Sequence, residues 1–184
     1  NLVGISLCAK SGEAAYIPIQ HDYEGAPKQL SKKMVIEKLK PLLEKVPVVG
    51  QHIKFDRNVL AQHGLEINNI ASDSMLMSYV LDSTATRHNL DAMAKFYLNY
   101  TTTTYEEVAG KGVKQTTFNQ VDLAAGSHYA AEDADVTFRC YELLKEKLAK
   151  TPKLEKVLTE IDLPMIKVLS EVEQNGALVD SEVL

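Results

Sequence analysis

Short apolar runs alternate with segments of helical periodicity along this chain, and this alternation constrains its fold more than any other feature. Residues 2–8 and 14–19 have the length and apolar content of two strands joined by a turn at Gly12. A further short apolar run begins at Val48, and helical patterns precede and follow it. The order strand, strand, helix, strand, helix, strand, helix, helix predicts an α/β domain with a mixed central sheet flanked by helices.

Residues that favour helix ends bound several of the predicted helices. Ser31 can cap a helix that runs to about Val46, and Pro41 should kink or restart that helix. Gly64 and Gly176 stand where two other helices should stop. Further helices are expected over residues 57–63, 88–99 and 127–149, and two more should begin at about residues 73 and 153. Residues 100–120 are expected to form a mostly irregular loop.

Composition excludes several classes of protein. Apolar residues make up 45% and charged residues 24%, as in ordinary globular proteins, and no apolar run is long enough for a membrane span. Cys8 and Cys140 form neither a CxxC pair nor a cluster with histidine, so a disulfide framework or a structural zinc site is not indicated. The net charge of −5 argues against gripping a duplex through many phosphates. Binding of a few nucleotides, or of a divalent metal by acids, stays open.

The stretch HYAAEDADVTF contains three acids that a helix would place on different faces. At about 3.6 residues per turn, Asp133 shares an apolar stripe with Tyr129. Asp135 forms an i,i+4 pair with Arg139 on the opposite face, and Glu132 lies near the edge. We therefore expect Asp135 and Glu132 on a solvated surface and Asp133 turned inward.

A carboxylate on an apolar stripe needs compensation, because burying it unpaired is costly. A cationic side chain, a helix N-terminus or a wet cleft rim would compensate Asp133, and so would a divalent cation. Tyr129 could orient a water beside a metal-bound carboxylate, although tyrosines also pack in cores. Asp56 follows a predicted central strand, where ligands of α/β proteins bind, but a lone Asp at a strand end more often caps a helix. The two acids together indicate a joint metal site.

Two stretches, VGQHIKFDRNVL and HYAAEDADVT, resemble the second and third exonuclease motifs of bacterial DNA polymerase I, a family-A DNA polymerase. The similarity continues in YIPIQHDY, LKPLLE, DSMLMSYVL, RHNLDAMA, YEEVAGKG and TFNQV. The tail EIDLPMIKVLSEVEQNGALVD resembles the start of a polymerase domain. The resemblance implies a ribonuclease-H-like 3′→5′ exonuclease fold over residues 1–150 and a C-terminal helical connector over 151–184.

The resemblance also implies a proofreading reaction, in which the 3′-terminal phosphodiester of single-stranded or frayed DNA is hydrolysed. Two divalent metal ions would assist, Mg²⁺ or Mn²⁺, with Zn²⁺ as an alternative at one site. By motif position, Asp56 and Asp133 are metal ligands, and both are catalytic together with Tyr129. The positions that match substrate contacts are Gln51, His52, Phe55, Arg87 and Tyr105.

The residues that match substrate contacts could also have purely structural roles. Phe55 and Tyr105 could stack on bases or simply pack, and Arg87 could be a surface cation. His52 stands where close relatives carry Asn, and an imidazole can also hydrogen-bond to a substrate. The sequence alone does not decide between these alternatives.

The family places a DxE pair of metal-binding acids on a first strand, which would precede Asn1. We therefore expect the sheet to lack its first strand and to show an open gap or edge. The chain opens with NLVGISLCAK, without an initiator Met, as a piece of a longer protein would. This piece alone is expected to be inactive or to bind metal weakly.

Three functional hypotheses follow. The leading one is a monomeric proofreading domain in the bacterial cytoplasm, associated with the nucleoid and without membrane contact, whose partners are a single-stranded DNA 3′ end and the polymerase domain of the same chain. The second is a non-catalytic, exonuclease-like structural domain, and the presence of Asp56, Tyr129 and Asp133 argues against it. The third is a free-standing ribonuclease, which the polymerase-like tail disfavours.

Overall fold

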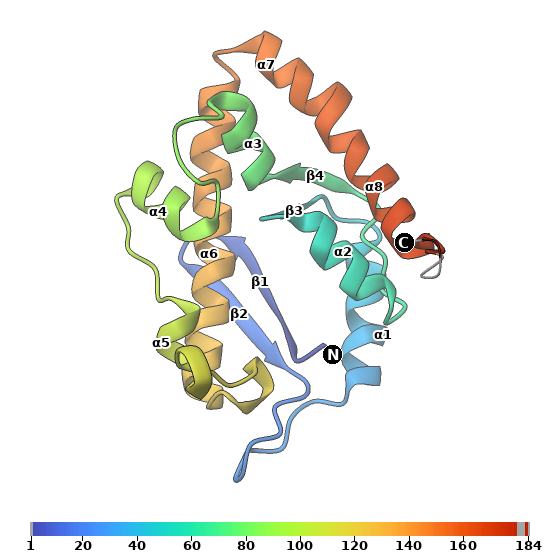
Figure 1. Cartoon of the computed structure of the whole chain (residues 1–184), viewed down its shortest axis with the longest axis vertical. Coiled ribbons are helices and arrows are strands. Elements are labelled where there is room, and N and C mark those ends of the chain that lie inside the picture. The colour runs from blue at the N-terminus through green and yellow to red at the C-terminus, as the bar shows by residue number, and fades with distance from the viewer. Residues whose placement is uncertain (1, 180–182, 184) are drawn as a thin grey trace.

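Two pairs of strands form the sheet portion of the computed structural model, which describes residues 2–179 and 183 (Figure 1). The end of the predicted connector, residues 180–182 and 184, lies outside the described residues. Strand β1 (Gly4–Lys10) pairs antiparallel with β2 (Glu13–Pro18), and β3 (Val48–Gly50) pairs parallel with β4 (Ile70–Asp73). The mixture of strand directions confirms the predicted α/β class.

The expected gap in the sheet is present. Among residues 2–179, the β1–β2 pair and the β3–β4 pair are separate sheets with no ladder between them. Gly12 forms the turn between β1 and β2 in a left-handed conformation, φ 80°, which glycine adopts without a steric penalty. Strand β3 is shorter than predicted, because it ends at Gly50 and does not reach Lys54.

Helices cover the strands and extend beyond them. They are α1 (Lys32–Leu43), α2 (Ile53–Ala61), α3 (Ser74–Leu81), α4 (Leu90–Leu98), α5 (Tyr105–Ala109), α6 (Leu123–Leu148), α7 (Pro152–Val157) and α8 (Leu163–Asn175). Single turns η1 (Gly112–Lys114) and η2 (Phe118–Gln120) interrupt the long loop, and a π-helical turn η3 (Leu158–Asp162) joins α7 to α8. None of the helices that the structure describes could cross a membrane.

Local capping explains most helix ends. The Ser31 side chain accepts a hydrogen bond from the Met34 amide at 3.3 Å, as predicted, and α1 continues through Pro41. Helix α6 begins earlier than predicted, because the Asp122 carboxylate accepts the amide of Ala124 at 2.9 Å and so caps it.

The long helix α6 lies between two groups of elements (Figure 1). It contacts β1 and β2, and it also contacts α3 and α4. Its buried residues Val136, Cys140 and Leu144 form one apolar cluster with Met77 and Met93. A second cluster joins β1, α1 and α2, with Leu2, Ile5, Val35, Leu39, Leu43, Ile53 and Leu60 among its buried members.

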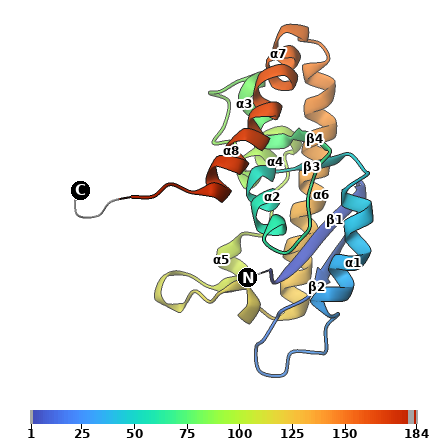
Figure 2. The same ribbon diagram turned by 90° about the vertical axis from the view of Figure 1, so that its right-hand side faces the viewer.

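Helix α8 returns along the molecule to lie beside α2. Both views show the two helices next to each other, with α7 above them (Figures 1 and 2). Helix α8 therefore contacts the helix that carries Asp56.

Candidate functional site

Asp56 lies inside the first turn of α2. The sequence predicted a helix starting at Arg57, but α2 starts at Ile53. Its N-cap residue, His52, has a left-handed backbone with φ 60° and makes no side-chain cap hydrogen bond. The alternative that Asp56 caps a helix is therefore wrong, because Asp56 lies four residues beyond the cap.

The cap of α2 comes from Asp73, at the end of β4. Its Oδ2 accepts the backbone N–H of Ile53 at 2.7 Å, and its Oδ1 accepts those of Met75 at 2.9 Å and Leu76 at 3.2 Å. The side chain is 1% exposed. One buried carboxylate thus holds the N-termini of both α2 and α3, where a negative charge is favourable. The sequence predicts a helix start at Asp73, but its bond to the second helix, α2, spans 20 positions and no local pattern predicts it.

The environment of Asp56 favours a nearby positive charge. The residue is exposed, yet burial by the surrounding protein, with the Asp73 charge as a second cause, raises the pKa of Asp56 to about 6. The carboxyl is thus accessible to solvent and still has many protein atoms around it. A bound cation would reverse the shift, because it stabilises the ionised form.

Asp133 and Tyr129 form a pair on α6, one turn apart, as the predicted stripe requires. Burial raises the pKa of Asp133 to about 7, hydrogen bonding by the Tyr129 hydroxyl opposes this shift, and the charges of Asp91 and Glu132 add to it. Burial, followed by the charge of Asp133, raises the pKa of Tyr129 as well. The pairing is confirmed, while the catalytic role of the two residues stays a prediction.

Aromatic rings surround Tyr129. Its ring centroid lies 6.1 Å from that of Tyr105 and 6.0 Å from that of Phe118, and the latter two are 6.4 Å apart. The three rings come from α5, η2 and α6. They are half-buried, so they pack together and also offer edges to a ligand. The sequence does not predict a role for Phe118, and its only signal there is the family-like stretch TFNQV.

The acids assigned to a solvated face are instead tied to other parts of the chain. Asp135 Oδ1 accepts the amide of Gly12 at 2.6 Å. Glu132 accepts the Tyr100 hydroxyl at 2.6 Å and the amide of Thr103 at 2.7 Å. The predicted surface positions of Asp135 and Glu132 are therefore wrong, because helical periodicity does not reveal what packs against each face.

The Gln51 side chain uses its hydrogen-bonding groups inside the protein. Its Nε2 donates to the carbonyl of His88 at 2.8 Å, and its Oε1 accepts the Ser74 hydroxyl at 2.5 Å. The first bond connects the end of β3 to the loop that carries Arg87, which is exposed, and the second connects it to the start of α3. Direct substrate contact by Gln51 stays a prediction, and the observed role of its amide is to hold that loop.

Phe55 and His52 lie next to Asp56 at the start of α2. Their rings meet edge to face with centroids 6.4 Å apart. Phe55 is 64% exposed, so the alternative that it simply packs in the core is wrong. An exposed aromatic ring beside a carboxylate is free to stack on a base.

Asp56 and Asp133 have the chemistry that a divalent metal site requires. Their oxygens are the hard ligands that Mg²⁺ and Mn²⁺ prefer, and the raised pKa values of Asp56 and Asp133 would be relieved by a cation. Helices α2 and α6, which carry these acids, both contact β3. Within residues 2–179, however, no three Asp, Glu, His or Cys side chains are placed as one metal ion would require.

Comparisons with known proteins identify the family of the chain. A family model described as 3′-5′ exonuclease matches residues 1–149. DNA polymerase I of Pseudomonas aeruginosa is 50% identical over 187 residues, which cover 100% of this chain and 20% of that protein. DNA polymerase I of Rhizobium leguminosarum is 38% identical over 202 residues, again covering all of this chain and 20% of the relative. The chain thus spans about a fifth of the length of these curated relatives.

A solved structure shows the same fold. It is the POL domain of Pol1 from M. smegmatis in complex with DNA primer-template and dNTP, with a TM-score of 0.69 and 19% identity, covering 97% of this chain and 26% of that one. Because the identity is low, this likeness concerns the fold alone, and it agrees with the ribonuclease-H-like arrangement predicted. The match of the family model and the two DNA polymerase I relatives show that the chain belongs to the 3′-5′ exonuclease domain family of DNA polymerase I.

Proposed function

We propose that this chain is the proofreading nuclease part of a DNA polymerase I, which hydrolyses the 3′-terminal phosphodiester of single-stranded or frayed DNA. The observation that carries this proposal is the pair of Asp133 and Tyr129, a half-buried carboxylate one helical turn from a phenol, with two further aromatic rings around that phenol. Its partners would be a DNA 3′ end and the polymerase domain of the same chain, in a monomeric protein of the bacterial cytoplasm at the nucleoid.

Each residue has a role in this proposal that its surroundings support. Asp56 and Asp133 would hold Mg²⁺ or Mn²⁺, with Zn²⁺ an alternative at one site. When bound, such ions activate a water and neutralise the charge on the leaving oxygen. The Tyr129 hydroxyl, held beside Asp133, would orient the attacking water. Phe55 and Tyr105 would stack on the terminal bases regardless of sequence, as a proofreader requires.

Three further residues would complete the grip on the DNA end. Arg87 is exposed and can reach a phosphate. Gln51 holds the Arg87 loop through one N–H of its amide, and the second N–H of that amide could donate to the DNA end. His52, next to Phe55, can offer an imidazole nitrogen to the sugar or phosphate.

We further propose that residues 1–150 form the nuclease unit and residues 151–184 the connector. In this division, the 184 residues alone are inactive or bind metal weakly, because the described residues bring no third ligand to Asp56 or Asp133. The second candidate function is a structural domain without catalysis.

One substitution separates the two candidates. In a full-length polymerase that contains this chain, Asp133→Ala should abolish Mg²⁺-dependent degradation of single-stranded DNA and leave primer extension unchanged. Degradation at the wild-type rate would overturn the role of Asp133. A wild-type polymerase that degrades no single-stranded DNA would identify the domain as structural.

A further inference from the structure

Helix α8 holds one face of α2, and Asp56 lies on another face. Lys54, Arg57 and Asn58 have the i, i+3, i+4 spacing of neighbours on one side of a helix, and all three bond to α8. Asp56 is two residues away from both Lys54 and Asn58, which is a rotation of about 200° around the helix axis. Its side chain therefore leaves α2 on nearly the opposite side from theirs. Helix α8 therefore holds α2 by the face that carries Lys54, Arg57 and Asn58, and it leaves the face with Asp56 uncovered.

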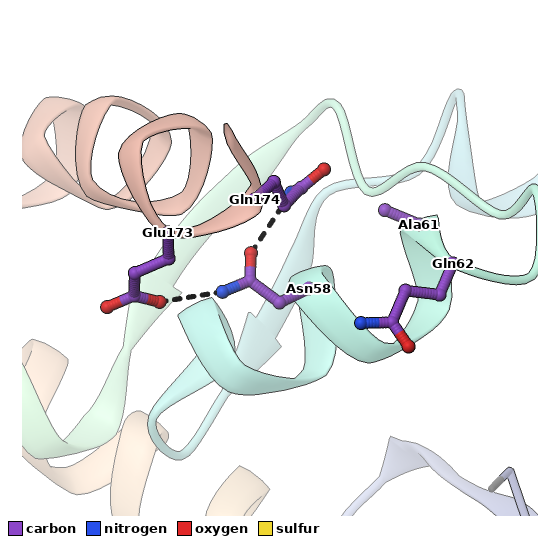
Figure 3. A pocket seen from close by; sticks show the side chains of 5 residues that line it. All are labelled: Asn58, Ala61, Gln62, Glu173 and Gln174. Atoms are coloured by element: carbon purple, nitrogen blue, oxygen red, sulfur yellow. Dashed lines mark hydrogen bonds between the residues drawn. The ribbon is translucent and has the colours of Figure 1, made fainter. Parts of the chain in front are cut away.

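Asn58 is the centre of the contact, and Figure 3 shows it between two residues of α8. Its Nδ2 donates to Glu173 Oε2 at 2.7 Å, and its Oδ1 accepts Gln174 Nε2 at 3.1 Å. Its Oδ1 also accepts the hydroxyl of Ser170, which is 0% exposed. Both ends of the Asn58 amide are thus committed to α8, which fixes the rotation of α2 as well as its position.

Two cations strengthen the same contact. Lys54 pairs with Glu173, and Arg57 donates to the buried Ser170 hydroxyl. The hydrogen bond from Lys54, together with its charge, lowers the pKa of Glu173, so this carboxylate is ionised at neutral pH. A charged acceptor makes the bond from Asn58 stronger than a bond between neutral groups.

The N-terminus of α2 is fixed separately, by the bond from the Ile53 amide to Asp73. With its start held by Asp73 and its back held by α8, α2 has one orientation in which to present Asp56. We infer that Asn58 and Glu173 are positioning residues for Asp56, so that the docking of α8 sets the geometry of the nuclease site. This inference rests on the proposed function, in which Asp56 belongs to that site.

An exchange of the amide and the carboxylate within the pair tests the inference in the full-length polymerase. Asn58→Asp places a carboxylate against the Glu173 carboxylate and should separate the helices. Adding Glu173→Gln restores the contact, because the new amide can donate to the new carboxylate. Glu171→Gln is the matched control, since Glu171 lies on the same helix and its contact is an exposed pair with Lys167 at 3.9 Å.

Two measurements are needed on each variant. Hydrogen exchange of the α2 amides reports the positioning directly and needs no substrate or metal. Single-turnover degradation of single-stranded DNA across a Mg²⁺ titration reports the consequence. We expect Asn58→Asp to speed α2 exchange and slow degradation by about tenfold each, with a higher Mg²⁺ requirement and an unchanged KM for DNA. The double variant should recover most of the slow α2 exchange and most of the degradation rate, although it keeps the new charge at position 58. Glu171→Gln should match the wild type in both measurements.

The possible failures are distinguishable. If Asn58→Asp leaves α2 exchange unchanged, or speeds it without altering degradation or its Mg²⁺ dependence, the positioning role is wrong. If the double variant fails to recover, the new charge and not the lost contact is responsible, and the inference also fails. Asp56→Asn, measured alongside, tests the proposed function itself, because full activity in that variant would remove Asp56 from the site whatever Asn58→Asp does.

Discussion

The carboxylate of Asp73 accepts the backbone N–H of Ile53 at 2.7 Å, across 20 positions of sequence. Asp73→Asn should have two effects. Asparagine has an NH₂ group in place of one carboxylate oxygen, so a backbone N–H that donates to that oxygen would lose its acceptor. This loss should lower the free energy of unfolding by about 1–3 kcal/mol. The substitution also removes the charge that raises the pKa of Asp56, which should fall below about 6.

Denaturant unfolding and an NMR titration of the Asp56 carboxyl would check both effects of Asp73→Asn. The control is Asp82→Asn, because Asp82 is exposed and bonds only locally to Thr84. An unchanged Asp56 pKa in Asp73→Asn would contradict the electrostatic link between the two acids.

The stability of the chain should depend on Asp133 in a defined pH window. The folded-state pKa of Asp133 is raised to about 7, so between its ordinary value and 7 the folded chain binds a proton that the unfolded chain has released. Stability therefore falls as pH rises through this window. Asp133→Asn removes the dependence and should raise the free energy of unfolding by about 1–3 kcal/mol above pH 7.

Urea unfolding of wild type and Asp133→Asn at several pH values, with a chelator present, would measure this dependence. Glu142→Gln on the same helix is the control, since Glu142 is exposed. Parallel pH profiles for wild type and Asp133→Asn would refute the burial of this carboxylate.

The left-handed backbone of His52, φ 60°, should govern what that position tolerates. Asn adopts this conformation more readily than most residues, whereas a β-branched residue does not. His52→Asn should change the free energy of unfolding by less than about 0.5 kcal/mol, and His52→Val should lower it by about 1–3 kcal/mol. Thermal unfolding of the two variants checks this, and equal stability of both would show that the strain is absent.

Asp135 should matter to stability although it is a charged residue on a helix. Asp135→Ala removes the acceptor of the Gly12 amide at 2.6 Å and the ion pair with Arg139 at 3.6 Å. The loss should lower the free energy of unfolding by about 1–2 kcal/mol. Glu142→Ala, an exposed position two turns along α6, should change it by less than about 0.5 kcal/mol. Similar losses of unfolding free energy in the two variants would show that Asp135 behaves as an ordinary surface residue.

Phe118 should influence the nuclease through Tyr129. Phe118→Leu removes a ring 6.0 Å from Tyr129 and 6.4 Å from Tyr105. We expect degradation of single-stranded DNA by the full-length polymerase to slow by about three- to tenfold, because both neighbouring rings lose a contact. Phe96→Leu is the control, since Phe96 is 58% exposed on α4. Equal rates for the two variants would exclude Phe118 from the site.

Sequence reasoning succeeded where the determining contacts are local. Tyr129 and Asp133 lie four residues apart on one helix, so periodicity alone places them together. The cap at Ser31 acts on an amide three residues away and could be predicted for the same reason.

Sequence reasoning failed where the partner is distant. The group that bonds Asp135 is the Gly12 amide, 123 positions away, and no pattern around Asp135 reveals it. The start of α2 was misplaced because its cap comes from Asp73 and not from a residue next to the helix. The role of Glu173 was missed for the same reason, since its contact with Asn58 spans 115 positions.

The place of α6 between the β1–β2 hairpin and the pair α3–α4 has a consequence for unfolding. Because α6 contacts both groups, it cannot leave its place without breaking its contacts with each of them. Local opening is therefore expected to begin elsewhere, in the loop around η1, where Val113 is fully exposed. The amides at the centre of α6 should exchange only when the whole domain unfolds, as a single cooperative unit.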